Sequence, residues 1–169
     1  MIELKKLVEL EDEFRVLGKS LIPTGAKVSV VSVLGAPGKS TLMNNLLGQN
    51  VFTNSKNTTK GIYTFKTGNQ VYLDHQGVSE TTELAAFTSF FSDTILIIAE
   101  SHSNNFGDSI MPVLFNELLK ERTHKSNIVV VVKNHSKQSE LSKIKQNFTQ
   151  KLEKQWNQGI QTLKSIDKE

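Results

Sequence analysis

One run, Val28-Ser29-Val30-Val31-Ser32-Val33-Leu34-Gly35-Ala36-Pro37-Gly38-Lys39-Ser40-Thr41, decides the fold of this chain. Its β-branched first half predicts a buried strand, and the residues that follow the glycines predict a helix. A strand, a turn ending in Gly-Lys-Ser and a helix form the setting of a phosphate-binding loop. In such a loop, backbone N–H groups at the helix N-terminus surround an anion. We therefore predict a phosphate site around Lys39 and Ser40.

The predicted loop is short. The pattern G-x-x-x-x-G-K-[ST] requires a glycine five positions before Gly38, and Val33 stands there. The nearest glycine, Gly35, is two residues too close, and Pro37 has no N–H to donate. We therefore expect fewer donors around a phosphate than a complete loop supplies. An ordinary strand–turn–helix corner is the alternative interpretation.

The composition sets limits on the class of protein. A chain of 169 residues with 37% hydrophobic residues suits one domain with one core. The net charge of +3 comes from lysines spread along helical faces, so no nucleic-acid partner is expected. The absence of cysteine excludes disulfides and thiolate metal sites. Because no signal peptide or membrane anchor is recognisable, we expect a cytoplasmic protein, peripheral to membranes at most through partners.

Apolar periodicity predicts alternating strands and helices within a single domain over 1–169. The predicted strands span 28–34, 61–66, 70–74, 94–99 and 127–132. The predicted helices span 2–17, 40–47, 80–91, 108–122 and 139–163, and a lead-in to residue 27 follows the first of them. The core of the domain is expected over 28–135.

This alternation predicts a three-layer α/β fold with a mostly parallel sheet. We expect 28–34, 94–99 and 127–132 to be its parallel central strands and 61–74 to form a two-stranded edge. Ligands bind such sheets at the carboxyl ends of the strands. The segments 35–40, 74–77 and 133–135 all follow strands, so we expect them to converge on one ligand site.

Three further motifs follow the loop along the chain. They are Thr58-Thr59-Lys60-Gly61-Ile62-Tyr63, Asp74-His75-Gln76-Gly77 and Lys133-Asn134-His135. Together with Gly-Lys-Ser-Thr-Leu-Met-Asn-Asn-Leu-Leu-Gly, they resemble the G domains of guanylate-binding proteins, atlastins and root-hair-defective type proteins. These are large GTPases of the dynamin superfamily. The resemblance covers 28 to about 156 and implies a P-loop GTPase-like fold.

The resemblance also implies a set of site residues for Mg²⁺ and GTP. Lys39 would hold the β- and γ-phosphates, Ser40 and Thr59 would hold Mg²⁺, and Asp74 would reach the metal through water. Gly77 would donate its N–H to the γ-phosphate. The remaining nucleotide contacts implied are those of Gly35, Ala36, Gly38, Thr41, Lys133 and Asn134.

Departures from the family pattern keep several functions open. Gln76 replaces a glutamate, Asn134 replaces the aspartate that reads guanine, and no arginine lies in 35–39. Unaided GTP hydrolysis should therefore be slow. One alternative is a degenerate pseudo-GTPase that acts as an interaction module, and another is an ATP-type P-loop NTPase. The resemblance also allows a homodimer through the G domain.

Overall fold

The fold is described from a computed structural model, which places residues 5–10, 14–16, 28–35, 37–52, 61–76, 82–100, 114–115, 126–133 and 140–166. Seven strands are β1 (Lys5–Leu10), β2 (Phe14–Val16), β3 (Ser29–Gly35), β4 (Gly61–Thr67), β5 (Gln70–Gln76), β6 (Thr94–Glu100) and β7 (Asn127–Lys133). The helices are α1 (Lys39–Leu47), α2 (Thr82–Phe91) and α4 (Leu141–Ile166).

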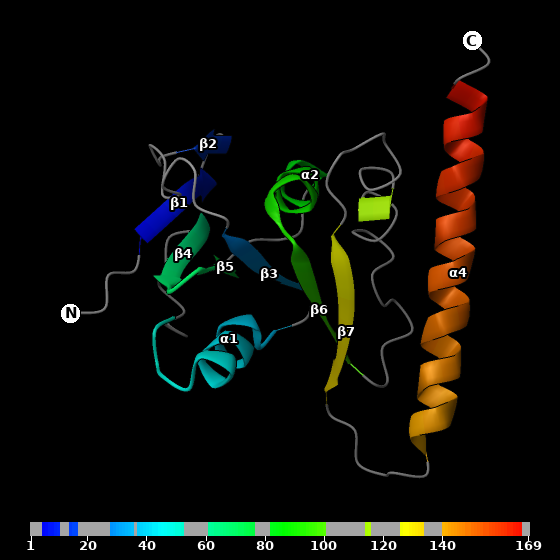
Figure 1. The fold of residues 1–169 in the computed structure, drawn as a ribbon. Helices are drawn as coiled ribbons and strands as arrows, with labels where there is room; N and C mark the ends of the chain where they lie inside the picture. The colour runs from blue at the N-terminus through cyan, green and yellow to red at the C-terminus, as the bar shows by residue number, and fades with distance from the viewer. Residues whose placement is uncertain are drawn as a thin grey trace.

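The seven strands form one sheet in the order β2-β1-β4-β5-β3-β6-β7 (Figure 1). β3 pairs in parallel with β5 on one side and with β6 on the other, and β6 pairs in parallel with β7. The contacts β4–β5, β1–β4 and β1–β2 are antiparallel. Five strands (β1, β3, β5, β6 and β7) therefore point the same way, which confirms the prediction of an α/β domain with a mostly parallel sheet.

The predicted hairpin at 61–74 exists, but its predicted place at the edge of the sheet is wrong. β4 and β5 pair along their whole length from Gly61↔Gln76 to Thr67↔Gln70. β5 lies against β3 and β4 lies against β1, so the hairpin is inside the sheet. The outer positions are taken by β1 and β2, in a segment for which the sequence predicts a helix.

The predicted N-terminal helix over 2–17 is wrong, because residues 5–10 and 14–16 are the strands β1 and β2. β1 pairs with β4 from Lys5↔Thr64 to Glu9↔Gly61. The apolar spacing of this segment is compatible with a helix. However, the open edge of β4 offers a row of backbone hydrogen-bonding groups that only a strand can satisfy. Tertiary pairing therefore overrides local periodicity. Of the predicted helix over 108–122, only residues 114–115 are described.

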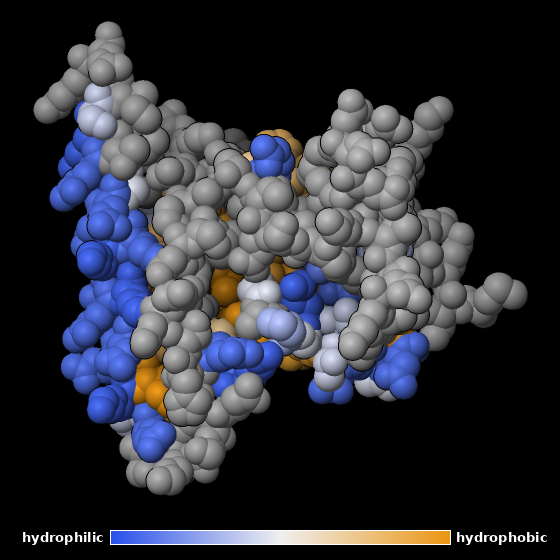
Figure 2. All heavy atoms as spheres, turned by 180° about the vertical axis from the view of Figure 1, so that it is seen from behind, coloured by the Kyte–Doolittle hydropathy of each residue, from blue (hydrophilic) through white to orange (hydrophobic). Residues whose placement is uncertain are grey.

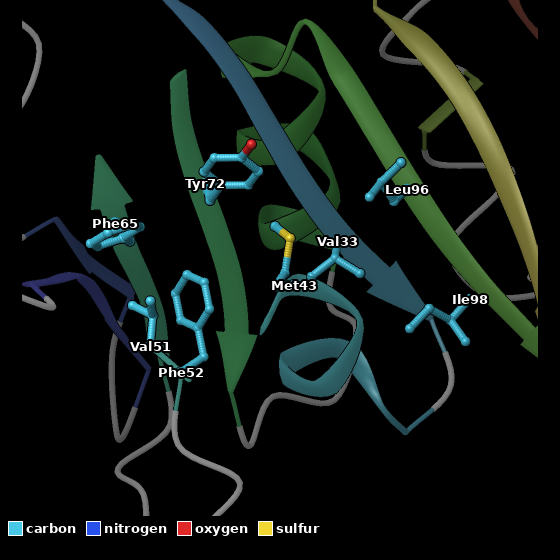
Figure 3. Close-up of a cluster of buried hydrophobic side chains, with 8 residues drawn as sticks. All are labelled: Val33, Met43, Val51, Phe52, Phe65, Tyr72, Leu96 and Ile98. Atoms are coloured by element: carbon cyan, nitrogen blue, oxygen red, sulfur yellow. The ribbon is translucent and has the colours of Figure 1, made fainter. Parts of the chain in front are cut away.

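One hydrophobic cluster fills the space between the sheet and α1 (Figure 3). Met43 of α1 is fully buried and points toward Val33 of β3. The other members come from neighbouring strands and from the turn after α1: Val51, Phe52, Phe65, Tyr72, Leu96 and Ile98. Because side chains alternate along a strand, Val33 faces α1 while the adjacent Leu34 faces the opposite layer.

The opposite face of the sheet is covered by α2 and α4, which completes the three layers (Figure 1). Phe87 of α2 packs on a cluster that contains Val30 and Leu73. Phe148 and Leu152 of α4 pack on a second cluster, which contains Leu34 and the strand residues Ile95, Ile97 and Ala99. Figure 2 shows the outer surface of α4 as hydrophilic, so this helix is amphipathic as its sequence predicts. No helix in the described part of the chain could span a membrane.

The end of β3 lies against the backbone of β6 at Gly35. This glycine has a φ of 95°, in the left-handed region. A Cβ atom at this position would overlap the carbonyl oxygen of Ile98 and lie 2.9 Å from its backbone nitrogen. Only glycine satisfies both constraints, so Gly35 is needed to bring the loop against β6.

We expect Gly35→Ala to lower the free energy of unfolding by about 2–4 kcal/mol, because both the Cβ overlap and the positive φ act on it. Gly48→Ala is the matched control. Gly48 also has a positive φ, of 65°, but a Cβ there meets nothing within 4 Å. Its loss should be about 1 kcal/mol. Urea denaturation measures both, and equal losses would contradict the role given to the contact with Ile98.

Candidate phosphate and metal site

The candidate site lies at the carboxyl end of β3, where the chain connections diverge. From β3 the chain passes through α1 to the β4–β5 hairpin on one side of β3, and then through α2 to β6 on the other side. α1 and α2 lie on opposite faces of the sheet (Figure 1). Such a switch in connection leaves a crevice beyond the strand ends, which is where open α/β sheets bind ligands.

The N-terminus of α1 follows the end of β3 and has no side-chain cap. Its N-cap is Gly38, which has a φ of 109° and no side chain to accept hydrogen bonds from the first turn. Leu42 donates its N–H to the Gly38 carbonyl, which closes the first helical turn. In an α-helix the first N–H groups point out of the N-terminus, toward the end of β3 in the case of α1. This end of α1 therefore favours an anion.

Two lysines hold the loop through its carbonyl groups. The Lys39 ammonium donates to the Gly35 carbonyl at 3.2 Å, and the Lys133 ammonium donates to the Pro37 carbonyl at 2.6 Å. Lys133 also forms an ion pair with Glu100 at 3.1 Å. Since both partners of that pair are partly exposed, the pair contributes little to stability. The ammonium groups of Lys39 and Lys133 therefore both lie at the connection between β3 and α1.

A buried carboxylate joins α1 to β5. The Ser40 hydroxyl donates to Oδ2 of Asp74 at 2.6 Å, and Asp74 is fully buried. Asp74 lies on β5 directly opposite Val33 of β3, near the start of the loop. A hydroxyl and a carboxylate are oxygen ligands, which Mg²⁺ prefers. Within the described ranges no three His, Cys, Asp or Glu side chains group as a metal site, so a metal here would need further oxygen ligands.

The structure brings together most of the predicted site residues that it describes. Gly35, Gly38, Lys39, Ser40, Asp74 and Lys133 meet at the end of β3, and Thr41 lies exposed on the first turn of α1. Ala36, Thr59, Gly77 and Asn134 lie outside the described residues. The sequence argument missed Glu100, which lies beside Lys133 because the two residues end the adjacent parallel strands β6 and β7 in register.

Asn44 was also missed, although it lies one turn after Ser40 on the same face of α1. Its Oδ1 accepts hydrogen bonds from the N–H groups of Val51 and Phe52 at 2.9 and 2.8 Å, and its Nδ2 donates to the Phe52 carbonyl at 2.9 Å. Asn44 is buried, so these three bonds satisfy the amide away from water. They fix the turn after α1 to the helix that carries Lys39 and Ser40.

His75 follows Asp74 on β5 and faces the opposite side of the sheet. Its Nε2 lies 3.3 Å from the Thr88 hydroxyl of α2, and it is buried with Nδ1 lacking a partner among the described residues. Burial, and to a lesser extent the positive charge of Lys39, lowers the pKa of His75 from 6.5 to about 3. The imidazole is therefore neutral at physiological pH and links β5 to α2.

A search of protein-family models with this sequence finds no match. A crystal structure of Aquifex aeolicus Era bound to GDP and AlF4⁻ superposes with a TM-score of 0.51 and 21% identity, over 74% of this chain and 48% of that one. The chain has the P-loop GTPase fold.

Two other proteins are similar to this chain. GTPase Era from Halothermothrix orenii is 45% identical over 60 residues, which cover 31% of this chain and 20% of that protein. Era in complex with MgGDPNP and nucleotides 1506–1542 of 16S ribosomal RNA superposes with a TM-score of 0.48 at 22% identity, over 73% of this chain and 47% of that one. The chain thus spans about half of the Era chains in these structures and a fifth of the Halothermothrix protein.

The lowered pKa of His75 predicts that the free energy of unfolding depends on pH. In the unfolded chain its pKa returns to about 6.5, so between about pH 6.5 and 3 the unfolded state binds more protons than the folded state. Its contribution to the free energy of unfolding is complete above pH 6.5 and is lost as the pH falls, by about 1.4 kcal/mol per pH unit.

We expect His75→Leu to remove this contribution to the change of the free energy of unfolding with pH. Urea denaturation of both proteins at several pH values between 7 and 4 measures the difference, which cancels the titration of other groups. Parallel curves for the two proteins would show that His75 is charged in the folded state.

Proposed function

We propose that this chain is a GTP-binding domain that holds GTP together with Mg²⁺ and hydrolyses it slowly at most. The observation that carries the proposal is the Ser40–Asp74 hydrogen bond of 2.6 Å beside the uncapped end of α1. It puts a pair of hard oxygen ligands next to an anion site, which is the combination that a metal–triphosphate complex needs. Lys39 adds the positive charge for the terminal phosphates.

Mg²⁺ fits the oxygen ligands that are present. Ser40 and Asp74, with Thr59 from the first motif, would hold the metal, which would neutralise charge on the β- and γ-phosphates when bound. A buried carboxylate costs less free energy beside a cation than without one. Gly77 would complete the phosphate contacts, and Lys39, Ser40, Thr59 and Gly77 would form the catalytic set.

Guanine rather than adenine is proposed because of the motif after β7. Lys133 reaches the loop carbonyl of Pro37, which puts the end of β7 beside the phosphate site. The next residue, Asn134, would accept a hydrogen bond from guanine through its amide oxygen. The relatives named above are Era GTPases, and the fold shared with one of them supports the same base.

The finer resemblance to guanylate-binding proteins and atlastins rests on motif residues alone, and so does a homodimer through the G domain. The expectation that nucleic acids are not partners has no support, because Era is bound to ribosomal RNA in one of the structures named above. A cytoplasmic location likewise stays a prediction.

The short loop favours a second candidate function, a pseudo-GTPase that acts as an interaction module. The loop has a proline inside the turn, and the carbonyls of Gly35 and Pro37 already accept hydrogen bonds from the two lysines. A lysine ammonium that donates to a carbonyl has one fewer N–H for a phosphate oxygen. Both candidates share the fold and differ in affinity for the nucleotide, so a binding titration separates them.

If the domain binds nucleotide, GTP should bind more tightly than ATP in the presence of Mg²⁺, and Lys39→Ala should abolish binding because it removes the charge at the loop. Fluorescence titration with labelled GTP and ATP measures both. Lys143→Ala is the matched control, since Lys143 is exposed on α4, far from the loop in sequence. Equal affinities for the two nucleotides, or normal binding by Lys39→Ala, would count against the proposal.

Lengthening the loop should raise the affinity. We expect insertion of Ser-Ser between Ala36 and Pro37, together with Pro37→Ser, to strengthen GTP binding roughly a hundredfold. Each charge-assisted hydrogen bond regained contributes ~1.5–3 kcal/mol, and each ~1.4 kcal/mol is a factor of ten. The same titration measures the gain, with Pro37→Ser alone as the control. Tight binding by the unaltered chain would contradict the argument, and no gain would mean that the defect lies beyond the loop.

A further inference from the structure

Glu100 lies at the carboxyl end of β6, on the face of the sheet that α1 covers. Ile98 is opposite Gly35 at the end of β3 and belongs to the cluster under α1 (Figure 3). Side chains alternate between the two faces of a strand, so Glu100, two residues after Ile98, is on the same face. Glu100 therefore extends from β6 beyond the point at which β3 ends.

Lys133 joins Glu100 to the connection between β3 and α1. The two residues are paired in register on β6 and β7. The Lys133 ammonium lies 3.1 Å from Oε1 of Glu100 and donates a hydrogen bond of 2.6 Å to the Pro37 carbonyl. A hydrogen bond from a charged donor is stronger than one between neutral groups. A continuous chain of contacts therefore runs from Glu100 through Lys133 to the backbone of Pro37.

The Pro37 carbonyl belongs to the same peptide group as the N–H of Gly38. A trans peptide is planar, and its C=O and N–H point in opposite directions. No peptide bond among the described residues is cis. Because the Pro37 carbonyl is directed toward Lys133, the Gly38 N–H is directed away from Lys133. The hydrogen bond from Lys133 therefore fixes the direction in which the loop presents this N–H.

The Gly38 N–H is one of the donors at the start of α1. Gly38 has a left-handed backbone conformation, with φ 109° and ψ 9°, and Lys39 is the first residue of the right-handed helix. Successive residues of opposite hand turn their N–H groups toward one concave point, an arrangement that binds anions. A carbonyl that accepts a charged hydrogen bond also polarises its peptide, which strengthens the N–H on the other side as a donor. The contact of Lys133 with Pro37 therefore bears on phosphate binding at Gly38.

We propose that Glu100 is a positioning residue for the phosphate site. Its carboxylate holds the Lys133 ammonium at the Pro37 carbonyl, and Lys133 in turn holds the Pro37–Gly38 peptide with its N–H directed to the phosphate. Glu100 and Lys133 lie on the carbonyl side of that peptide, so neither contacts the phosphate on the N–H side. This role rests on the proposed function and adds to it a residue that none of the sequence motifs contains.

Isothermal titration calorimetry of the whole chain tests this role. In the presence of Mg²⁺ it measures dissociation constants for GTP and for inorganic tripolyphosphate, which has no base. Glu100→Ala should weaken the binding of both ligands about threefold, the size of effect that a partly exposed ion pair produces. Lys133→Met should weaken both about tenfold, because it also removes the charged hydrogen bond to Pro37. Glu153→Ala, on an exposed site of α4, is the matched control and should bind both ligands as the unaltered chain does.

Two further variants separate positioning from a general loss of structure. Lys133→Arg should retain most of the affinity, since a guanidinium also donates to a carbonyl and pairs with a carboxylate. The double variant Glu100→Ala/Lys133→Met should bind as Lys133→Met does, because Glu100 acts only through Lys133. In the NMR spectrum of the ligand-free chain, the Gly38 amide signal should shift in Glu100→Ala and stay in place in Glu153→Ala. Circular dichroism confirms that each variant is folded.

The outcomes distinguish this role from the proposed function. Tighter binding by Glu100→Ala would show that Glu100 repels phosphate, and additive losses in the double variant would show that it acts without Lys133; either result overturns the role. A loss in Lys133→Met that is confined to GTP would mean that Lys133 contacts the base, which overturns the role as well. If tripolyphosphate binds with the expected losses but GTP binds no more tightly than ATP, the proposed function fails and the role of Glu100 stands. If neither GTP nor tripolyphosphate binds, both fail.

Discussion

The parallel pairing of β3 with β5 on one side and β6 on the other is the constraint on which the rest of the structure depends. It brings together the carboxyl ends of three strands, at or near which Gly35, Asp74 and Glu100 lie. It also requires two crossovers in opposite directions, so that α1 and α2 cover opposite faces. The position of the candidate site follows from this topology before any side chain is considered.

Hydrogen bonds between segments then hold the residues of the candidate site together. The Ser40–Asp74 bond links α1 to β5, and the Lys133–Pro37 bond links the end of β7 to the loop. Asn44 fixes the turn after α1 to the same helix. Each bond joins elements that are distant in sequence, so the loop is held by strands and helices rather than by its own four residues. A change in any of these elements would shift the site.

The strands at the two edges of the described sheet differ in length and in the regularity of their pairing. The β2 edge is short and follows a bulged strand, while the β7 edge is long and regular. The core under β6 and β7 is nevertheless closed on one face, where Ile128 and Val130 pack against the cluster that Phe148 and Leu152 join. Among the described residues, the exposed face of β7 is the one that carries Val129, not the face under α4.

The sequence by itself determined the central strands, the helices α1, α2 and α4 and the loop lysine and serine. In each case a buried apolar run, an amphipathic period or a Gly-Lys-Ser string acts over a few neighbouring residues. Only the tertiary structure decided that residues 5–10 and 14–16 form strands, that the β4–β5 hairpin lies inside the sheet and that Lys133 and Glu100 meet at the loop. Backbone groups at an open strand edge and charges at neighbouring strand ends find partners far along the chain. Local periodicity contains no information about such distant partners.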